Sequence, residues 1–218
     1  MSITEIIFFA AELVGTAAFS VAGTLVAIRR ELDIFGAVVV GTVTAVGGGC
    51  IRDILLGQTP PAMFSNPLYA GLAALLAIIV FALEYIITAR KILESKTYET
   101  VINIFDALGL AIFVVVGINT AEKSGHADNA FLSVCVGVLT GIGGGILRDL
   151  FVGTVPMVLR KQVYALPAIA GGIIYYILSV NNVNNIVSVI IIIVLIMTVR
   201  ILAARFRWDL PKIKQHQK

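Results

Sequence analysis

Residues 47–57, with the sequence GGGCIRDILLG, recur as GGGILRDLFVG at residues 143–153, 96 residues further along the chain. Both copies lie inside long apolar stretches, where three consecutive glycines remove side-chain packing and loosen a helical backbone. We therefore predict that a membrane helix breaks or bends at each triple glycine. Broken helices at matching positions of two halves are typical of a permeation or substrate site.

The composition indicates an integral membrane protein. Hydrophobic residues make up 59% of the 218 residues and charged residues 13%, and the mean hydropathy is +0.99. A soluble domain of this length is far less apolar. Charged, Asn-rich and Pro-rich breaks divide the chain into seven apolar segments, each close to the ~20 residues that cross a bilayer core. The segments are 5–28, 33–57, 67–89, 101–121, 129–153, 162–180 and 185–205.

Basic residues gather on one side of this seven-segment layout. Of the 16 lysines and arginines, 13 fall in three connections on one side or at the C-terminal end, which lies on the same side, whereas Lys123 lies in a loop on the other side. The 13 are Arg29, Arg30, Arg90, Lys91, Lys96, Arg160, Lys161, Arg200, Arg205, Arg207, Lys212, Lys214 and Lys218. By the positive-inside rule, the C-terminus is cytoplasmic and the N-terminus lies outside.

The repeat extends well beyond the glycines. Matching pairs in the two halves are Glu12 and Asp106, Gly15 and Gly109, Phe19 and Phe113, Gly23 and Gly117, Gly41 and Gly137, Thr44 and Thr140, Pro60 and Pro156, and Tyr69 and Tyr164. Each half holds three segments, and because three is odd the second half enters the membrane from the opposite side. We expect an all-α membrane protein with a first three-helix repeat at 1–98, an inverted repeat at 99–182, and a seventh helix with a basic tail at 183–218.

Six of the charged residues inside the predicted spans lie at mirrored depths in the two halves. We expect Glu12 to pair with Arg52 toward the outside, and Asp106 with Arg148 toward the cytoplasm. Asp53 and Asp149 directly follow the arginines, so on a helix they are expected to point elsewhere. Each charge in a span costs roughly 2.5 to 3.5 kcal/mol, so all six need partners or water.

Two interpretations of these charges stay open. They could form salt bridges that fix the packing of the spans, or they could line a wet vestibule at either end of a constriction. The four carboxylates and two arginines leave a formal charge of −2 near the axis, which favours cations over anions.

The triple glycines also have two interpretations. They could allow close helix packing, or they could mark an unwound turn whose free carbonyl oxygens coordinate a monovalent cation. The carbonyls in question belong to Gly47, Gly48, Gly143 and Gly144. Helix N-termini at the same break would instead favour an anion or a substrate carboxylate. The residues expected at the pore or kink are Gly47, Gly48, Gly49, Gly143, Gly144, Gly145, Thr44 and Thr140, and the two threonine hydroxyls could face a pore or bond back to their own helix.

The sequence predicts no enzyme. It contains no metal-ligand spacing, its two histidines lie in a loop and in the tail, and each triple glycine is followed by Arg-Asp where a phosphate-binding loop requires Lys-Ser or Lys-Thr. We expect no cofactor and no nucleic-acid partner. A channel and a secondary transporter remain the two competing functions.

The doubled signature GGG-x-x-R-D-x-(L/F)-x-G, two three-span repeats and a seventh helix resemble the prokaryotic branch of the trimeric intracellular cation (TRIC) channel family. The resemblance covers about residues 5–205. It implies a homotrimer in the cell's inner (plasma) membrane, in contact with membrane lipid, and one hourglass pore per protomer bounded by kinked second and fifth helices. It also implies that K+, with Na+, is the permeant ion.

Bacterial sequences of this kind are also labelled as a glycine transporter domain. The alternative function is therefore a secondary transporter for glycine or another small amino acid, with the broken helices forming a midplane substrate site.

Overall fold

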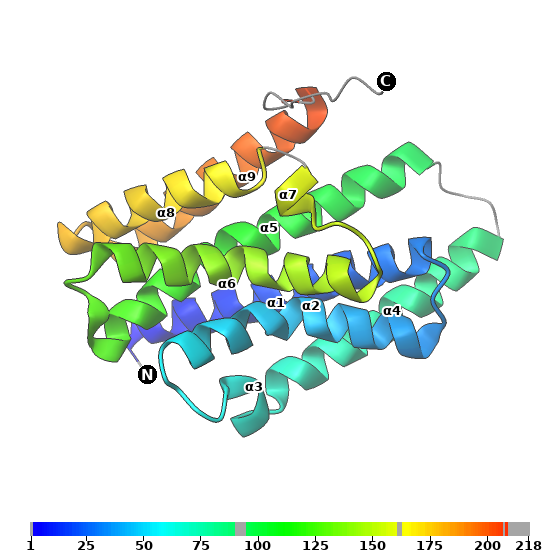
Figure 1. Ribbon diagram of the computed structural model, residues 1–218, viewed down its shortest axis with the longest axis horizontal. Coiled ribbons are helices and arrows are strands. Elements are labelled where there is room, and N and C mark those ends of the chain that lie inside the picture. Colours follow the sequence, from blue (N-terminus) through cyan, green and yellow to red (C-terminus); the bar gives the residue numbers. More distant parts are fainter. Residues whose placement is uncertain (1, 90–94, 161–162, 207, 209–218) are drawn as a thin grey trace, which may run out of the picture.

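The computed structural model describes residues 2–89, 95–160, 163–206 and 208, and these residues form a helical bundle (Figure 1). The helices are α1 (Ile3–Arg29), α2 (Ile34–Leu55), α3 (Ala62–Ser65), α4 (Leu68–Ala89), α5 (Ser95–Ala121), η1 (Glu122–His126), α6 (Ala130–Phe151), α7 (Met157–Arg160), α8 (Ala165–Val180) and α9 (Asn185–Phe206). The expectations for Arg90, Lys91, Lys161, Arg207 and the basic tail at 209–218 lie outside the described residues.

All seven predicted segments are helical, with boundaries close to those expected from the sequence. In the described part of the chain, six helices are long and apolar enough to cross a membrane, and α8 is a shorter apolar helix of 16 residues. The prediction of an all-α membrane protein is confirmed.

Polar caps set the starts of the long helices. Ser2 and Glu5 form a capping box at α1, the Asp33 carboxylate accepts the Gly36 amide of α2, and the Asn129 side chain accepts the Leu132 amide of α6. Each cap satisfies an amide that has no partner inside the helix.

The repeated signature ends in a glycine because α2 and α6 end in the same way. Gly57 and Gly153 have φ values of 70° and 67°, in the left-handed region where a side chain is unfavourable. The Gln58 amide donates to the Asp53 carbonyl and the Thr154 amide to the Asp149 carbonyl, both at 2.8 Å. These are the bonds of a Schellman motif, which turns the chain sharply out of the helix.

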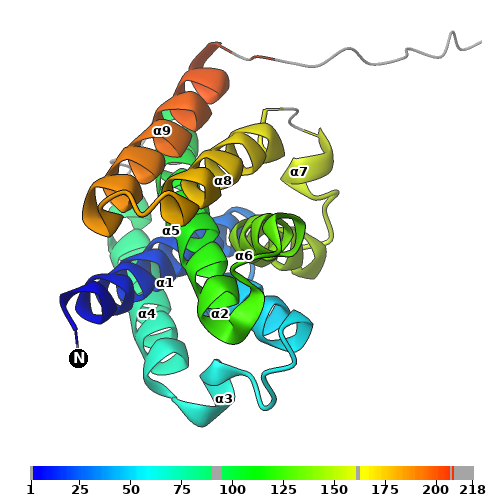
Figure 2. The same cartoon turned by 90° about the vertical axis from the view of Figure 1, so that its left-hand side faces the viewer.

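Two groups of three helices pack side by side. In the first, α1, α2 and α4 contact one another, and in the second, α5, α6 and α8 do so; α1 packs on α5 and α2 on α6, while α9 lies on α5 and α8 (Figure 2). Helix α1 runs away from the N-terminal end of the bundle and α5 runs back toward it (Figure 1). Helix α5 is the most enclosed of the long helices.

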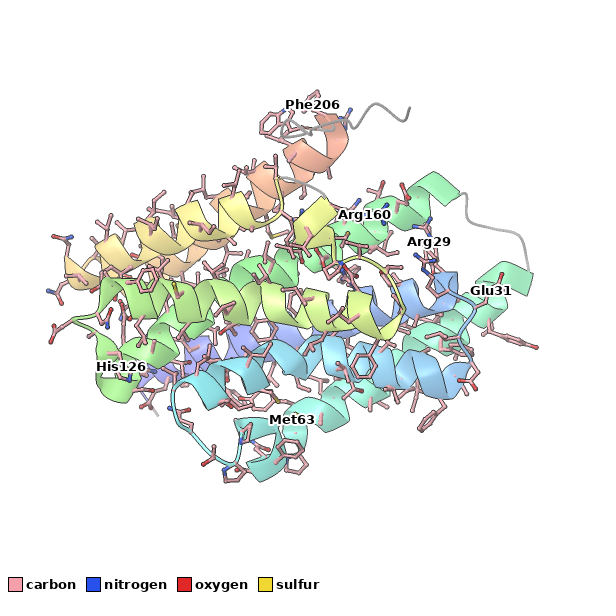
Figure 3. The ribbon with its side chains drawn as sticks, viewed as in Figure 1. Arg29, Glu31, Met63, His126, Arg160 and Phe206 are labelled. Atoms are coloured by element: carbon pink, nitrogen blue, oxygen red, sulfur yellow. The ribbon has the colours of Figure 1, made fainter. Side chains whose placement is uncertain are left out.

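The loops lie at two opposite ends of the bundle. Glu31 and Arg29 lie toward one end and His126 at the other, and Arg160 lies between them, nearer to Arg29 (Figure 3). We call these the Arg29 end and the His126 end.

The predicted break at the triple glycines is wrong. Both α2 and α6 remain α-helical through all three glycines to Leu55 and Phe151. The backbone carbonyls of Gly47, Gly48, Gly143 and Gly144 therefore lie within helix, without the unwound turn on which the predicted cation site depended. A bend of the helix axis that keeps the helix intact stays a prediction.

Candidate functional site

The triple glycines lie where α2 and α6 cross at close range. A Cβ atom on Gly48 would collide with the Thr140 carbonyl oxygen, and one on Gly144 would collide with the Thr44 carbonyl oxygen. Backbone meets backbone at both positions, so no side-chain movement could relieve the collision. The close-packing interpretation is therefore the one that the structure supports.

Thr44 and Thr140 do not offer free hydroxyls. Each hydroxyl donates to a carbonyl one turn earlier in its own helix, Thr44 to Val40 and Thr140 to Val136, both at 2.6 Å. Both side chains are fully buried. Of the two alternatives for these residues, the bond back to the helix is the one observed.

Two phenylalanines occupy the middle of the bundle. The rings of Phe19 and Phe113, which match in the repeat, lie 5.3 Å apart between centroids, and both are almost fully buried. Phe19 packs over Gly109 and Phe113 over Gly15. Because each ring is seven residues from its repeat's carboxylate, about 10 Å along a helix, one ionic cluster lies on each side of this aromatic pair.

The first cluster lies toward the His126 end. Arg52 Nη1 is 3.3 Å from Glu12 Oε1, and the Tyr69 hydroxyl donates to Glu12 Oε2 at 2.7 Å. The Glu12 side chain is 23% exposed. A cavity of about 70 Å³ contacts Glu12, Arg52 and Tyr69 as well as Gly49 and Phe113.

The second cluster lies toward the Arg29 end and is more deeply buried than the first. Asp106 Oδ1 is 2.6 Å from Arg148 Nη1, and Asp106 Oδ2 is 2.8 Å from Arg200 Nη2. Asp106 and Arg148 are both 0% exposed. The Arg200 guanidinium also lies over the Tyr164 ring, 3.9 Å from its centroid.

A cavity of about 950 Å³ opens next to this second cluster at the Arg29 end. Its lining includes Arg148, Asp149 and Arg200 of this cluster. Around its wall, Arg29 pairs with Glu99 at 3.4 Å, and Arg30 and Arg160 add further positive charge. The arginines that line the cavity outnumber its two carboxylates.

Asp53 and Asp149 do not point away from the arginines, as the sequence predicted. Asp53 Oδ1 accepts from Arg52 Nε at 2.8 Å and Asp149 Oδ1 from Arg148 Nε at 2.9 Å. The adjacent spacing allows this because an arginine side chain is long enough to fold its Nε back over the next residue.

The second oxygen of each aspartate holds the loop that follows the helix. Asp53 Oδ2 accepts the Ala62 amide at the start of α3, at 2.8 Å, and Asp149 Oδ2 accepts the Met157 amide at the start of α7, at 2.7 Å. The aspartate of each Arg-Asp pair therefore holds both the arginine side chain and the chain segment that follows the helix.

Known proteins match this chain along most of its length. The sequence model of a family described as "Glycine transporter" matches residues 9–85 and again residues 103–180. The inner membrane protein YadS of Escherichia coli K12 is 36% identical over 203 residues, 91% of each chain. The membrane protein YvgT of Bacillus subtilis 168 is 35% identical over 199 residues, 91% of this chain and 93% of that protein.

Two solved structures share the fold. The TRIC trimeric intracellular cation channel orthologue from Rhodobacter sphaeroides has a TM-score of 0.84 and 30% identity, covering 93% of this chain and 99% of that one. A prokaryotic TRIC channel in 0.5 M KCl has a TM-score of 0.83 and 32% identity, covering 94% and 100%. The chain belongs to the TRIC family. Its solved relatives are cation channels rather than enzymes.

The sequence of this TRIC chain predicted both acid–arginine pairs, and both are present. Sequence reasoning missed Arg200, which it grouped with the basic residues of one membrane side, and it matched Tyr69 with Tyr164 without giving them a role. Arg200 stands in an apolar stretch of α9 five residues before Arg205. That isolation among apolar residues was the available signal.

Proposed function

We propose that this TRIC family protein is a channel for monovalent cations, K+ and also Na+, with one pathway in each protomer. The pathway leads from the cavity at Glu12, past the Phe19 and Phe113 pair, to the cluster at Asp106 and the large cavity beyond it. In the arrangement described here the aromatic pair closes the middle.

The observation that carries this proposal is the placement of two matched ionic clusters on opposite sides of a narrow apolar layer. Buried charges of this kind mark ion pathways in membrane proteins, and an apolar constriction between wet regions is a recognised gate. At the His126 end charge also favours a cation, because the formal charge around Glu12, Arg52 and Asp53 is −1.

The same proposal covers assembly and orientation. We place the Arg29 end in the cytoplasm on the positive-inside rule, which puts the N-terminus outside, in a cell inner membrane. We assign the two groups of three helices to an inverted repeat, supported by the double match of one family model and the opposite directions of α1 and α5. A homotrimer in contact with lipid is supported by the trimeric channel from Rhodobacter sphaeroides.

Planar-bilayer recording of the purified protein across a KCl gradient tests the channel. We expect discrete current steps that reverse near the K+ equilibrium potential. Glu12→Gln should lower the unitary current because it removes the carboxylate at the His126 end, whereas Glu31→Gln, at an exposed loop residue, should leave it unchanged. A bilayer that stays silent with folded, trimeric protein would contradict the channel.

A glycine transporter is the second candidate, since the matching family model carries that description. The structure does not favour a midplane substrate site built from broken helices, because α2 and α6 are continuous. Saturable uptake of radiolabelled glycine into liposomes, abolished by Glu12→Gln, would favour the transporter.

A further inference from the structure

The two ionic clusters match in sequence but differ in one partner of the central carboxylate. At the His126 end, one oxygen of Glu12 faces Arg52 and the other accepts the neutral hydroxyl of Tyr69. At the Arg29 end, one oxygen of Asp106 faces Arg148 and the other faces a second arginine, Arg200. A positive charge thus stands beside Asp106 where an uncharged donor stands beside Glu12.

The extra arginine comes from outside the repeat. Arg200 belongs to α9, the seventh long helix, which packs on α5 and α8. With Asp106, Asp149, Arg148 and Arg200, the formal charge of the enclosed cluster is zero, against −1 for Glu12, Asp53 and Arg52. Helix α9 therefore removes the negative charge that the repeat would otherwise place at both ends.

Arg200 is held at few points and has space beside it. Its Nη2 bonds to Asp106 and its guanidinium stacks on Tyr164, while its buried Nε has no hydrogen-bond partner among the described residues. The same side chain lines the cavity of about 950 Å³. The guanidinium therefore has open space beside it on the side of the cavity.

We propose that the Arg200 guanidinium is a tethered cation, which occupies beside Asp106 the position that a permeating cation takes beside Glu12. The inference rests on the proposed channel function. A cation passing the Arg29 end must displace this guanidinium, so Arg200 sets how readily that end conducts. It acts through Asp106, as a positioning residue of the pathway.

A double-mutant cycle at Arg200 and Asp106 tests the proposal. The first readout is the mean current in symmetric KCl. Arg200→Gln leaves the cluster at −1 and should raise the current roughly three- to tenfold. Asp106→Asn should lower it, and the double variant should return toward wild type because its cluster is again neutral. Arg205→Gln is the matched control, since Arg205 is exposed on the same helix, and its current should equal that of the wild type.

The double variant separates charge from steric obstruction. If Arg200 only obstructs the path, the double variant conducts as well as Arg200→Gln, and that result overturns the proposal. An unchanged current in folded Arg200→Gln overturns it as well. Elution as a trimer in size-exclusion chromatography confirms folding, and Arg200→Met, which removes the charge but keeps an apolar stem, replaces Arg200→Gln if the latter does not fold.

A second readout does not depend on conduction. Binding of 86Rb+ to the purified protein should be several-fold tighter in Arg200→Gln than in wild type, and the gain should vanish in the double variant. If the wild type shows no current but Arg200→Gln binds Rb+ more tightly, the channel function is rejected and the tethered cation is retained. If the wild type conducts but Arg200→Gln does not bind Rb+ more tightly, only the tethered cation is rejected.

Discussion

At the scale of the residue, the aspartate of each Arg-Asp pair does more than neutralise a charge. Asp149 contacts both the fully buried Arg148 and the Met157 amide, and Asp53 makes the equivalent contacts with Arg52, which is buried but 7% exposed, and with the Ala62 amide. Removing one ionic partner from a buried arginine lowers the free energy of unfolding. The loop that follows each helix also loses its attachment.

Asp149→Asn should therefore destabilise the protein by about 2–4 kcal/mol, and Asp53→Asn by less, because Arg52 and its partner Glu12 are less enclosed than Arg148 and Asp106. The thermal unfolding midpoint of the purified protein in detergent measures both. Asp128→Asn, at an exposed loop position, serves as the control. Equal midpoints for Asp149→Asn and the control would show that the pairing does not stabilise the fold.

At the scale of the element, the close crossing of α2 and α6 depends on glycine at particular positions. Gly48→Ala or Gly144→Ala places a methyl group against a backbone carbonyl of the other helix. The two helices must then separate, at a cost of about 1–3 kcal/mol or more.

We expect each of these two variants to lower the unfolding midpoint in detergent. Gly71→Ala is the matched control, because Gly71 lies within helix α4 with open space around the added methyl. The control should keep or slightly raise the midpoint, since alanine is the better helix former. If Gly48→Ala and Gly71→Ala behave alike, the crossing is looser than the structure indicates.

At the scale of the whole molecule, the aromatic pair is the constriction of the proposed channel. Phe19 comes from the first group of helices and Phe113 from the second, and their rings meet in the middle of the bundle. Phe19→Ala and Phe113→Ala should each raise the open probability in bilayer recordings by making the apolar layer wider and easier to wet.

Phe131→Ala is the control for this prediction, because Phe131 is 81% exposed on α6 and lies away from the pair. Its channel activity should match that of the wild type. A Phe19→Ala protein that folds as a trimer yet opens no more often than wild type would place the gate elsewhere in the molecule.

The sequence by itself determined the membrane class, the seven helices, the repeat and the two acid–arginine pairs. These follow from local quantities: apolar segment length, and the cost of leaving Glu12 or Asp106 unpaired in a span. Only the tertiary structure decided that the triple glycines serve a helix crossing rather than an unwound turn, because glycine permits both and the neighbouring helix selects between them. The tertiary structure also decided that Arg200 joins the cluster at Asp106, since the contact spans 94 residues and the packing of α9 on α5, rather than any local pattern, brings the two charges together.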